Sequence, residues 1–163
     1  MISSDLFGST VHPVQRDEML CDGAVILRGF ALAKESLLLQ AINTIKAQAP
    51  FRHLITPGGF RMSVGMTNAG PLGWVSDKER GYRYEPRHPV TAAAWPAIPG
   101  ALLSLWNETT QYRAPPEACL VNLYREGARM GLHRDEDEAA ADAPVLSVSL
   151  GDGALFRTGG VSR

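Results

Sequence analysis

The stretch that decides the fold reads CLVNLYREGARMGLHRDEDE and covers residues 119–138. It opens on an apolar run typical of a β-strand, and a second short apolar run, after a Gly-containing turn, ends at His133. Asp135 follows two residues later. On a strand this spacing directs both side chains to the same face, whereas on a helix they would point apart. Asn122 and Tyr124 have the same spacing, so we expect them to share a face as well.

An imidazole and a carboxylate on one face form two thirds of a 2-His-1-carboxylate site, which holds Fe(II) and leaves coordination positions open. His133 and Asp135 are therefore the candidate metal ligands and catalytic residues. The alternative is a solvated turn pair, because His and Asp are common in turns. The second histidine of such a site does not follow Asp135 in this sequence.

Three segments resemble the AlkB-type oxidative demethylases, in the same order and with similar spacing. They are residues 119–138, residues 143–151 (APVLSVSLG) and residues 56–68 (TPGGFRMSVGMTN). The resemblance runs from about Asp22 to the last residue. It is closest to the bacterial members, because Gly73-Trp74 and Gly81-Tyr82-Arg83-Tyr84 fall where that group has its base-contacting lid.

The resemblance implies Fe(II) as the metal, 2-oxoglutarate as the co-substrate and O₂ as the oxidant. His133 and Asp135 would hold the iron. Asn122 and Tyr124 would bind 2-oxoglutarate, for which the Tyr124 hydroxyl is a suitable donor to a carboxylate.

On the substrate side, the resemblance implies that Trp74 stacks on the alkylated base and that Tyr82 contacts the nucleic-acid backbone. Both lie in a segment where an aromatic side chain has little core to join. Asp137 would accept a hydrogen bond from the exocyclic amine of the base. Met66 and Thr56 match positions that line the substrate side, although Met66 also continues an apolar strand face and fits the core equally well.

Other histidines and tryptophans match no functional position of the family. Trp95 and Trp106 are interpreted as packing residues. The upstream histidines are interpreted as surface residues; they are His12, His53 and His88.

Length and composition indicate one globular domain, with 163 residues of which 45% are hydrophobic and 20% charged. Apolar runs are too short to span a membrane, and the N-terminus lacks the basic region of a signal peptide, so we expect a cytoplasmic monomer. Cys21 and Cys119 form no metal-binding spacing and are interpreted as buried and inert.

The net charge of −1 argues against nucleic-acid binding through bulk positive charge, but the charge is unevenly distributed. Residues 50–90 carry six basic and three acidic side chains, whereas residues 117–142 carry three basic and seven acidic ones. This arrangement suits a phosphate-contacting rim around a metal cation. A solvated mixed surface would have the same composition.

The order of elements predicts a β-rich α+β fold. Apolar patterning predicts helices over residues 34–49 and 99–111 and a strand over residues 23–27. A turn at Pro57-Gly58-Gly59 is expected to join residues 51–56 and 60–67 in a hairpin. Residues 68–99 have no sustained period and are interpreted as a long ordered loop. Four short strands are expected after it, over residues 118–124, 130–134, 145–150 and 154–158.

The resemblance makes this fold a double-stranded β-helix, the jelly roll of the cupins, with N-terminal helices and a nucleotide-recognition lid over residues 50–90. Residues 1–163 would form a single, incomplete domain. Its closing strands, second iron-binding histidine and 2-oxoglutarate-binding arginines would lie beyond Arg163. We therefore expect the 163-residue chain alone to be inactive.

The expected function is oxidative demethylation of N-alkylated bases, such as 1-methyladenine and 3-methylcytosine, in single-stranded DNA or RNA. Formaldehyde would be released, as in the repair of DNA alkylation damage. Two alternatives stay open: an oxygenase that acts on another alkylated substrate, and an inactive homologue that binds alkylated nucleic acid. A sugar-binding jelly roll would need neither the Asn122/Tyr124 pair nor the His133/Asp135 pair.

Overall fold

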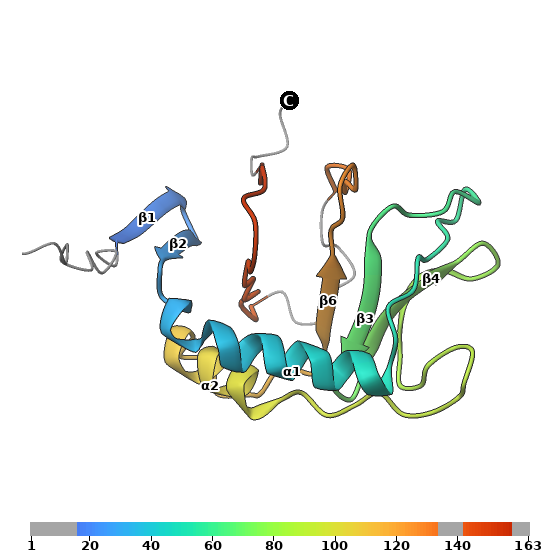
Figure 1. The fold of residues 1–163 in the computed structure, drawn as a ribbon, viewed down its shortest axis with the longest axis horizontal. Coiled ribbons are helices and arrows are strands. Elements are labelled where there is room, and N and C mark those ends of the chain that lie inside the picture. Colours follow the sequence, from blue (N-terminus) through green and yellow to red (C-terminus); the bar gives the residue numbers. More distant parts are fainter. Residues whose placement is uncertain (1–15, 134–141, 158–163) are drawn as a thin grey trace, which may run out of the picture. The chain divides into compact units, whose positions relative to one another are not determined.

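The computed structural model describes residues 16–133 and 142–157. The chain divides into two compact units. One unit contains residues 1–33 with 153–163, and the other contains residues 34–152. Figure 1 shows the elements of both units. None of the helices in the described ranges is long and apolar enough to cross a membrane.

The first unit contains an antiparallel hairpin of β1 (Arg16–Cys21) and β2 (Ala24–Arg28). The strands reverse at Gly23, whose φ of 80° lies in the left-handed region that glycine adopts without strain. Arg28 on β2 forms an ion pair with Glu18 on β1. The strand predicted over residues 23–27 is thus confirmed, with a shift of one residue.

Two helices form one layer of the second unit. After a 3₁₀ turn at Leu32–Lys34, α1 (Glu35–Gln48) buries a stripe at i, i+3 and i+7, formed by Leu38, Ala41 and Ile45. The helix α2 (Gly100–Thr109) starts after Pro99, which suits a helix N-terminus, and buries Leu105 and Trp106. The two helices lie side by side (Figure 1), and Lys34 forms an ion pair with Glu108 between them. Both predicted helices are confirmed.

A two-stranded antiparallel sheet joins β3 (Gly65–Ala69) to β6 (Cys119–Leu123), so the strand predicted at 118–124 is confirmed. All residues of β3 are buried. The Thr67 hydroxyl donates a hydrogen bond of 2.6 Å to the carbonyl oxygen of Ala49, just after α1. The two strands lie side by side in Figure 1.

The hairpin predicted over residues 51–67 is confirmed in part. Its turn exists, because the Thr56 N–H donates to the Phe60 carbonyl at 2.9 Å. Beyond the turn the two segments pair antiparallel through isolated bridges at Ile55↔Arg61 and Arg52↔Met66, and Arg52 and Met66 exchange both backbone hydrogen bonds. The continuous ladder of β3 forms with β6. Hydrophobic patterning identified the local pairing but not this second partner, since pairing with a remote strand depends on the tertiary fold.

The long loop predicted over residues 68–99 is also wrong. It contains an antiparallel hairpin of β4 (Gly73–Asp77) and β5 (Gly81–Glu85). Asp77 accepts the Arg80 N–H at 2.7 Å, and Gly81 supplies a φ of 69°, so the turn closes locally. Each strand has only five residues, which is too short for a sustained period to stand out.

Of the four strands expected late in the chain, only the first is present. Residues 130–133, 145–150 and 154–157 form no strand in the described structure. Val145 and Phe156 are 72% and 77% exposed. These segments alternate in sequence as strands do, but a strand exists only through hydrogen bonds to a neighbour. The described residues provide no such neighbour for them.

The first residue of β4 is a glycine because the Trp95 indole packs directly against its backbone. A Cβ atom added to Gly73 would lie 2.4 Å from Cε2 of the Trp95 indole. The indole Nε1–H donates to the carbonyl oxygen of Glu85, at the end of β5, at 2.9 Å. Trp95 therefore covers the open end of the hairpin and packs with Val75 and Ala49 in a buried cluster. Its predicted packing role is confirmed, as is that of buried Trp106.

We predict that Gly73→Ala lowers the free energy of unfolding by about 1–3 kcal/mol, the usual cost of overpacking. The added methyl group forces the Trp95 indole away from the hairpin and strains its hydrogen bond to Glu85. Urea denaturation measures the change. Gly100→Ala is the control, because a Cβ there has nothing within 4 Å. Equal stability of the two variants would contradict the close contact.

Candidate functional site

One face of the β3–β6 sheet contains the residues proposed to bind 2-oxoglutarate. Exposed and half-buried residues alternate along β6 and just beyond it. The exposed ones are Leu120, Asn122 and Tyr124. Tyr124 is 49% exposed. Directly opposite Asn122, Met66 of β3 lies on the same face of the sheet. The structure therefore places the Asn122/Tyr124 pair together, as the two-residue spacing predicted.

A methionine-rich cluster connects this face to the β4–β5 hairpin. Its buried residues are Leu54, Val64 and Met66, and the partly buried residues packed on them are Met62, Trp74, Ala128 and Met130. The Tyr124 hydroxyl lies 3.9 Å from the sulfur of Met130. Met66 is only 4% exposed, which is the burial expected of a core residue. Flexible thioethers are suited to irregular contacts of this kind.

Trp74 and Tyr82 stack on one face of the hairpin. Their ring centroids are 5.4 Å apart and the ring planes differ by 16°. Trp74 is opposite Tyr84 and Ser76 is opposite Tyr82, so the stacked rings form a diagonal cross-strand pair. Tyr82 remains 46% exposed. Trp74 does join a core, contrary to expectation, because the hairpin brings it onto the methionine-rich cluster.

Asn68, which sequence reasoning missed, fixes the backbone of Trp74. Its carboxamide accepts the Trp74 N–H and donates to the Trp74 carbonyl, each at 3.0 Å. Asn68 is 3% exposed, so its amide takes the place of a neighbouring strand for this residue. An Asn inside an apolar strand was the only available signal, since a buried amide requires partners.

Thr56 lies in the turn next to the same hairpin. Its hydroxyl oxygen accepts the N–H of Phe60 at 3.1 Å. The preceding carbonyl, of Ile55, accepts the hydroxyl of Ser76 on β4 at 2.6 Å. The turn and the hairpin are thus joined beside Trp74.

His133 is the described member of the predicted metal pair. It is exposed, and its Nδ1 lies 2.8 Å from the carbonyl oxygen of Gly131. A carbonyl oxygen only accepts, so Nδ1 donates this hydrogen bond, and a metal ligand at His133 would be Nε2 of the neutral ring. Asp135 and Asp137 lie outside the described residues. Within the described ranges, no three His, Cys, Asp or Glu side chains are grouped as a metal site.

The remaining histidines and cysteines differ from expectation at two positions. His53 is exposed, as predicted, but His88 is only 7% exposed. Its Nδ1 accepts the N–H groups of Val90 and Thr91. The pKa of His88 is lowered, mainly by burial and to a smaller extent by the positive charge of nearby Arg52. His12 lies outside the described residues.

Of the two cysteines, Cys21 is exposed, contrary to expectation. Burial raises the pKa of Cys119 to about 11, which keeps this thiol unreactive.

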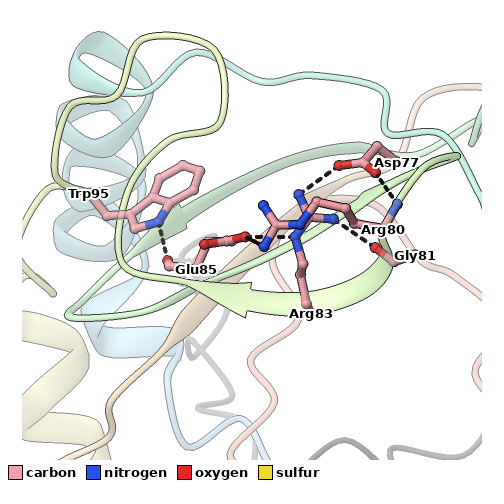
Figure 2. A network of polar contacts seen from close by, with 6 residues as sticks. All are labelled: Asp77, Arg80, Gly81, Arg83, Glu85 and Trp95. Atoms are coloured by element: carbon pink, nitrogen blue, oxygen red, sulfur yellow. Dashed lines mark hydrogen bonds and ion pairs between the residues drawn. The ribbon is translucent and has the colours of Figure 1, made fainter.

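The basic residues of segment 50–90 fall into two groups. Arg83 and Arg80 are paired with Asp77 and Glu85 on the hairpin itself (Figure 2). The other four contact no carboxylate of the described residues; they are Arg52, Arg61, Lys78 and Arg87. Positive charge that is available to an outside partner therefore comes from this second group.

Comparison with known proteins agrees with this arrangement. Residues 23–163 match the 2OG-Fe(II) oxygenase superfamily. The chain belongs to this family. Its AlkB branch is shown by the "Alpha-ketoglutarate-dependent dioxygenase AlkB" of Escherichia coli, which is 45% identical over 98% of this chain and 74% of that protein. The "Alpha-ketoglutarate-dependent dioxygenase AlkB homolog" of Caulobacter vibrioides is 54% identical over 81% of this chain. The match spans 60% of the Caulobacter protein's length.

A shorter match covers 27% of this chain, at 46% identity, in the "DNA N(6)-methyladenine demethylase ALKBH1D" of Arabidopsis thaliana. Membership of the 2OG-Fe(II) oxygenases implies a jelly-roll fold, and a family that uses Fe(II), 2-oxoglutarate and O₂.

We predict that Asn68→Asp destabilises this AlkB-type protein at pH 7 by about 1–3 kcal/mol, because a buried acceptor then faces the Trp74 carbonyl. Burial raises the pKa of the new carboxyl group. Once protonated, that group can donate to the carbonyl again, so the loss of stability shrinks as pH falls and grows as pH rises. Denaturation at several pH values tests this. Exposed Asn107→Asp serves as the control, and an identical pH profile for both variants would refute the proposed contact.

Proposed function

We propose that this protein is an Fe(II)- and 2-oxoglutarate-dependent dioxygenase that demethylates N-alkylated bases in single-stranded nucleic acid. The observation that carries the proposal is the methionine-rich cluster. It contacts Trp74 on one side, and on the other it contains Met66, opposite Asn122, and Met130, next to Tyr124. The cluster thus brings the candidate base-stacking ring and the candidate co-substrate residues into one neighbourhood.

His133 and Asp135 would hold the iron, and Asn122 and Tyr124 would bind 2-oxoglutarate. Bound Fe(II), with 2-oxoglutarate and O₂, supplies the oxidising power that hydroxylates the N-alkyl carbon, and the adduct then releases formaldehyde. This chain's own contribution is orientation. The Gly131 carbonyl holds the His133 ring, and the exposed Asn122 amide and Tyr124 hydroxyl offer donors to a carboxylate.

Residues 50–90 would form the nucleotide-recognition lid. Trp74 would stack on the flipped base, Tyr82 would contact the backbone, and Asp137 would accept from the exocyclic amine. Thr56 and Met66 would shape the substrate side, in which Met66 supports Trp74 from within the cluster. Two exposed cations of this segment suit the phosphates of the strand; they are Arg61 and Lys78.

The activity is tested by incubating the protein with Fe(II), 2-oxoglutarate and a 1-methyladenine oligonucleotide. We expect formaldehyde and succinate in equal amounts. His133→Ala should abolish both products and the stoichiometric binding of Fe(II) or Mn(II), whereas His53→Ala, which removes another exposed histidine, should change neither.

Metal binding that survives His133→Ala would overturn the assignment of this ligand. Tight binding of the methylated oligonucleotide with no formaldehyde at all would favour a binding module. Turnover of a methylated protein peptide, but not of the oligonucleotide, would show an oxygenase of another substrate class.

We predict that Trp74→Ala weakens binding of a methylated single strand by about 1–3 kcal/mol, the usual contribution of a base-stacking aromatic ring. Fluorescence anisotropy gives the dissociation constant, and thermal unfolding gives stability. Tyr112→Ala, which removes a half-buried ring next to Trp106, is the control. Unchanged affinity together with a lower melting temperature would make Trp74 a core residue only.

A further inference from the structure

We propose that Arg83 is a positioning residue for the Trp74–Tyr82 stack, although it lies on the opposite face of the hairpin and does not touch either ring. The inference rests on the proposed function, because it assigns Arg83 to the recognition of the alkylated base. No base or phosphate contact is required of Arg83.

The geometry shows that Arg83 spans the length of the hairpin. It occupies the middle of β5, opposite Val75. One end of its guanidinium reaches the turn, where Nη2 lies 2.6 Å from Asp77 and Nη1 lies 3.0 Å from the carbonyl oxygen of Gly81. Nε lies 2.7 Å from Glu85 at the open end. Figure 2 shows these contacts converging on one side chain.

The chemistry of these contacts requires arginine. A planar guanidinium spreads its donors over three nitrogen atoms, so that each contacts a different acceptor here, whereas the donors of a lysine ammonium all lie on one nitrogen. The Arg83 side chain is 16% exposed, so water competes little for its donors. Hydrogen bonds from Arg83 lower the pKa values of Asp77 and Glu85.

The contacts affect the stack because they limit movement between the two strands. A two-stranded hairpin is only marginally stable by itself. Trp74 and Tyr82 stack as a diagonal pair, so a shift in register would separate the rings or move them to the other face. Arg83 links Asp77, the last residue of β4, to Glu85, the last residue of β5, and so opposes such a shift.

Paired charges also exclude a simpler role for Arg83. Its donors are occupied by two carboxylates and a carbonyl, so it offers little positive charge to a phosphate. Sequence reasoning had counted Arg83 with the other basic residues of segment 50–90. The readable signal was Glu85, two residues further along the same strand and hence on the same face.

The test compares Arg83→Met with wild type and Trp74→Ala in the natural-length protein, with a methylated oligonucleotide. Methionine keeps the apolar stem but removes every donor. We expect KM and the dissociation constant to rise about 5- to 30-fold, which corresponds to losing one or two charge-assisted hydrogen bonds. We expect kcat to change less than about twofold, because a bound base still reaches the same reacting groups. Arg83→Lys should recover part of the affinity.

Salt dependence separates positioning from phosphate binding. The slope of log Kd against log salt should stay at its wild-type value in Arg83→Met, whereas a lost phosphate contact lowers it by about one. Exposed Arg87→Met is the matched control for loss of a positive charge. Asp77→Asn gives a second, milder test if Arg83→Met does not fold, and it should raise KM in the same direction.

The two proposals fail in different ways. Wild-type affinity in Arg83→Met and Asp77→Asn, with weakened binding in Trp74→Ala, would overturn the role of Arg83 and leave base stacking intact. Wild-type affinity in all three variants would overturn base stacking itself. A lower salt slope, or a fall in kcat as large as the rise in KM, would also exclude a positioning role.

Discussion

Pairing between β3 and β6 is the constraint on which the rest of this AlkB-type structure depends. These strands are remote in sequence, yet their register places Met66 directly opposite Asn122. Most residues proposed for the substrate lie on segments attached to β3, whereas those proposed for the co-substrate and the metal, with Asp137, lie on β6 and the residues after it. This ladder is the sheet pairing that joins the two halves of the site in the described structure, and two hydrogen bonds between the Ser63 hydroxyl and the Arg129 backbone reinforce it.

Small sheets of this kind need additional connections, and buried polar side chains provide them. Thr67 connects β3 to the end of α1, Asn68 connects β3 to Trp74, and Ser76 connects β4 to Ile55. In each case a side chain bonds to a backbone group that would otherwise need a strand neighbour or water. The resulting positions are specific, since an apolar residue of similar size would leave that backbone group unsatisfied.

Electrostatics divide the basic segment into internal and external parts. The carboxylates of the β4–β5 hairpin pair with Arg80 and Arg83, so these two cations hold the hairpin together and offer little charge to a partner. Arg61 and Lys78 are exposed and form no ion pair within the described residues, so they provide the charge that a nucleic-acid strand would meet. A count of charges along the sequence treats all of these residues alike. Only their contacts show which are already occupied.

The sequence by itself determined the elements whose signal is local. The stripe of α1, Pro99 before α2, and the compact apolar runs of β2 and β6 all depend on neighbours within a few residues, and their predicted ranges are confirmed. The family was identified by resemblance, because residues 56–68, 119–138 and 143–151 match the AlkB-type demethylases in order and spacing. The roles of the individual site residues stay predictions.

Only the tertiary structure decided the strand pairings and the burial that depend on residues remote in sequence. It paired β3 with β6 in addition to the local bridge between Met66 and Arg52, and it turned the supposed loop at residues 68–99 into a hairpin covered by Trp95. It also buried His88, whose Nδ1 accepts two backbone N–H groups as a polar turn residue would. Partner choice, burial and charge pairing arise from the free energy of the whole fold. No window of neighbouring residues contains that information.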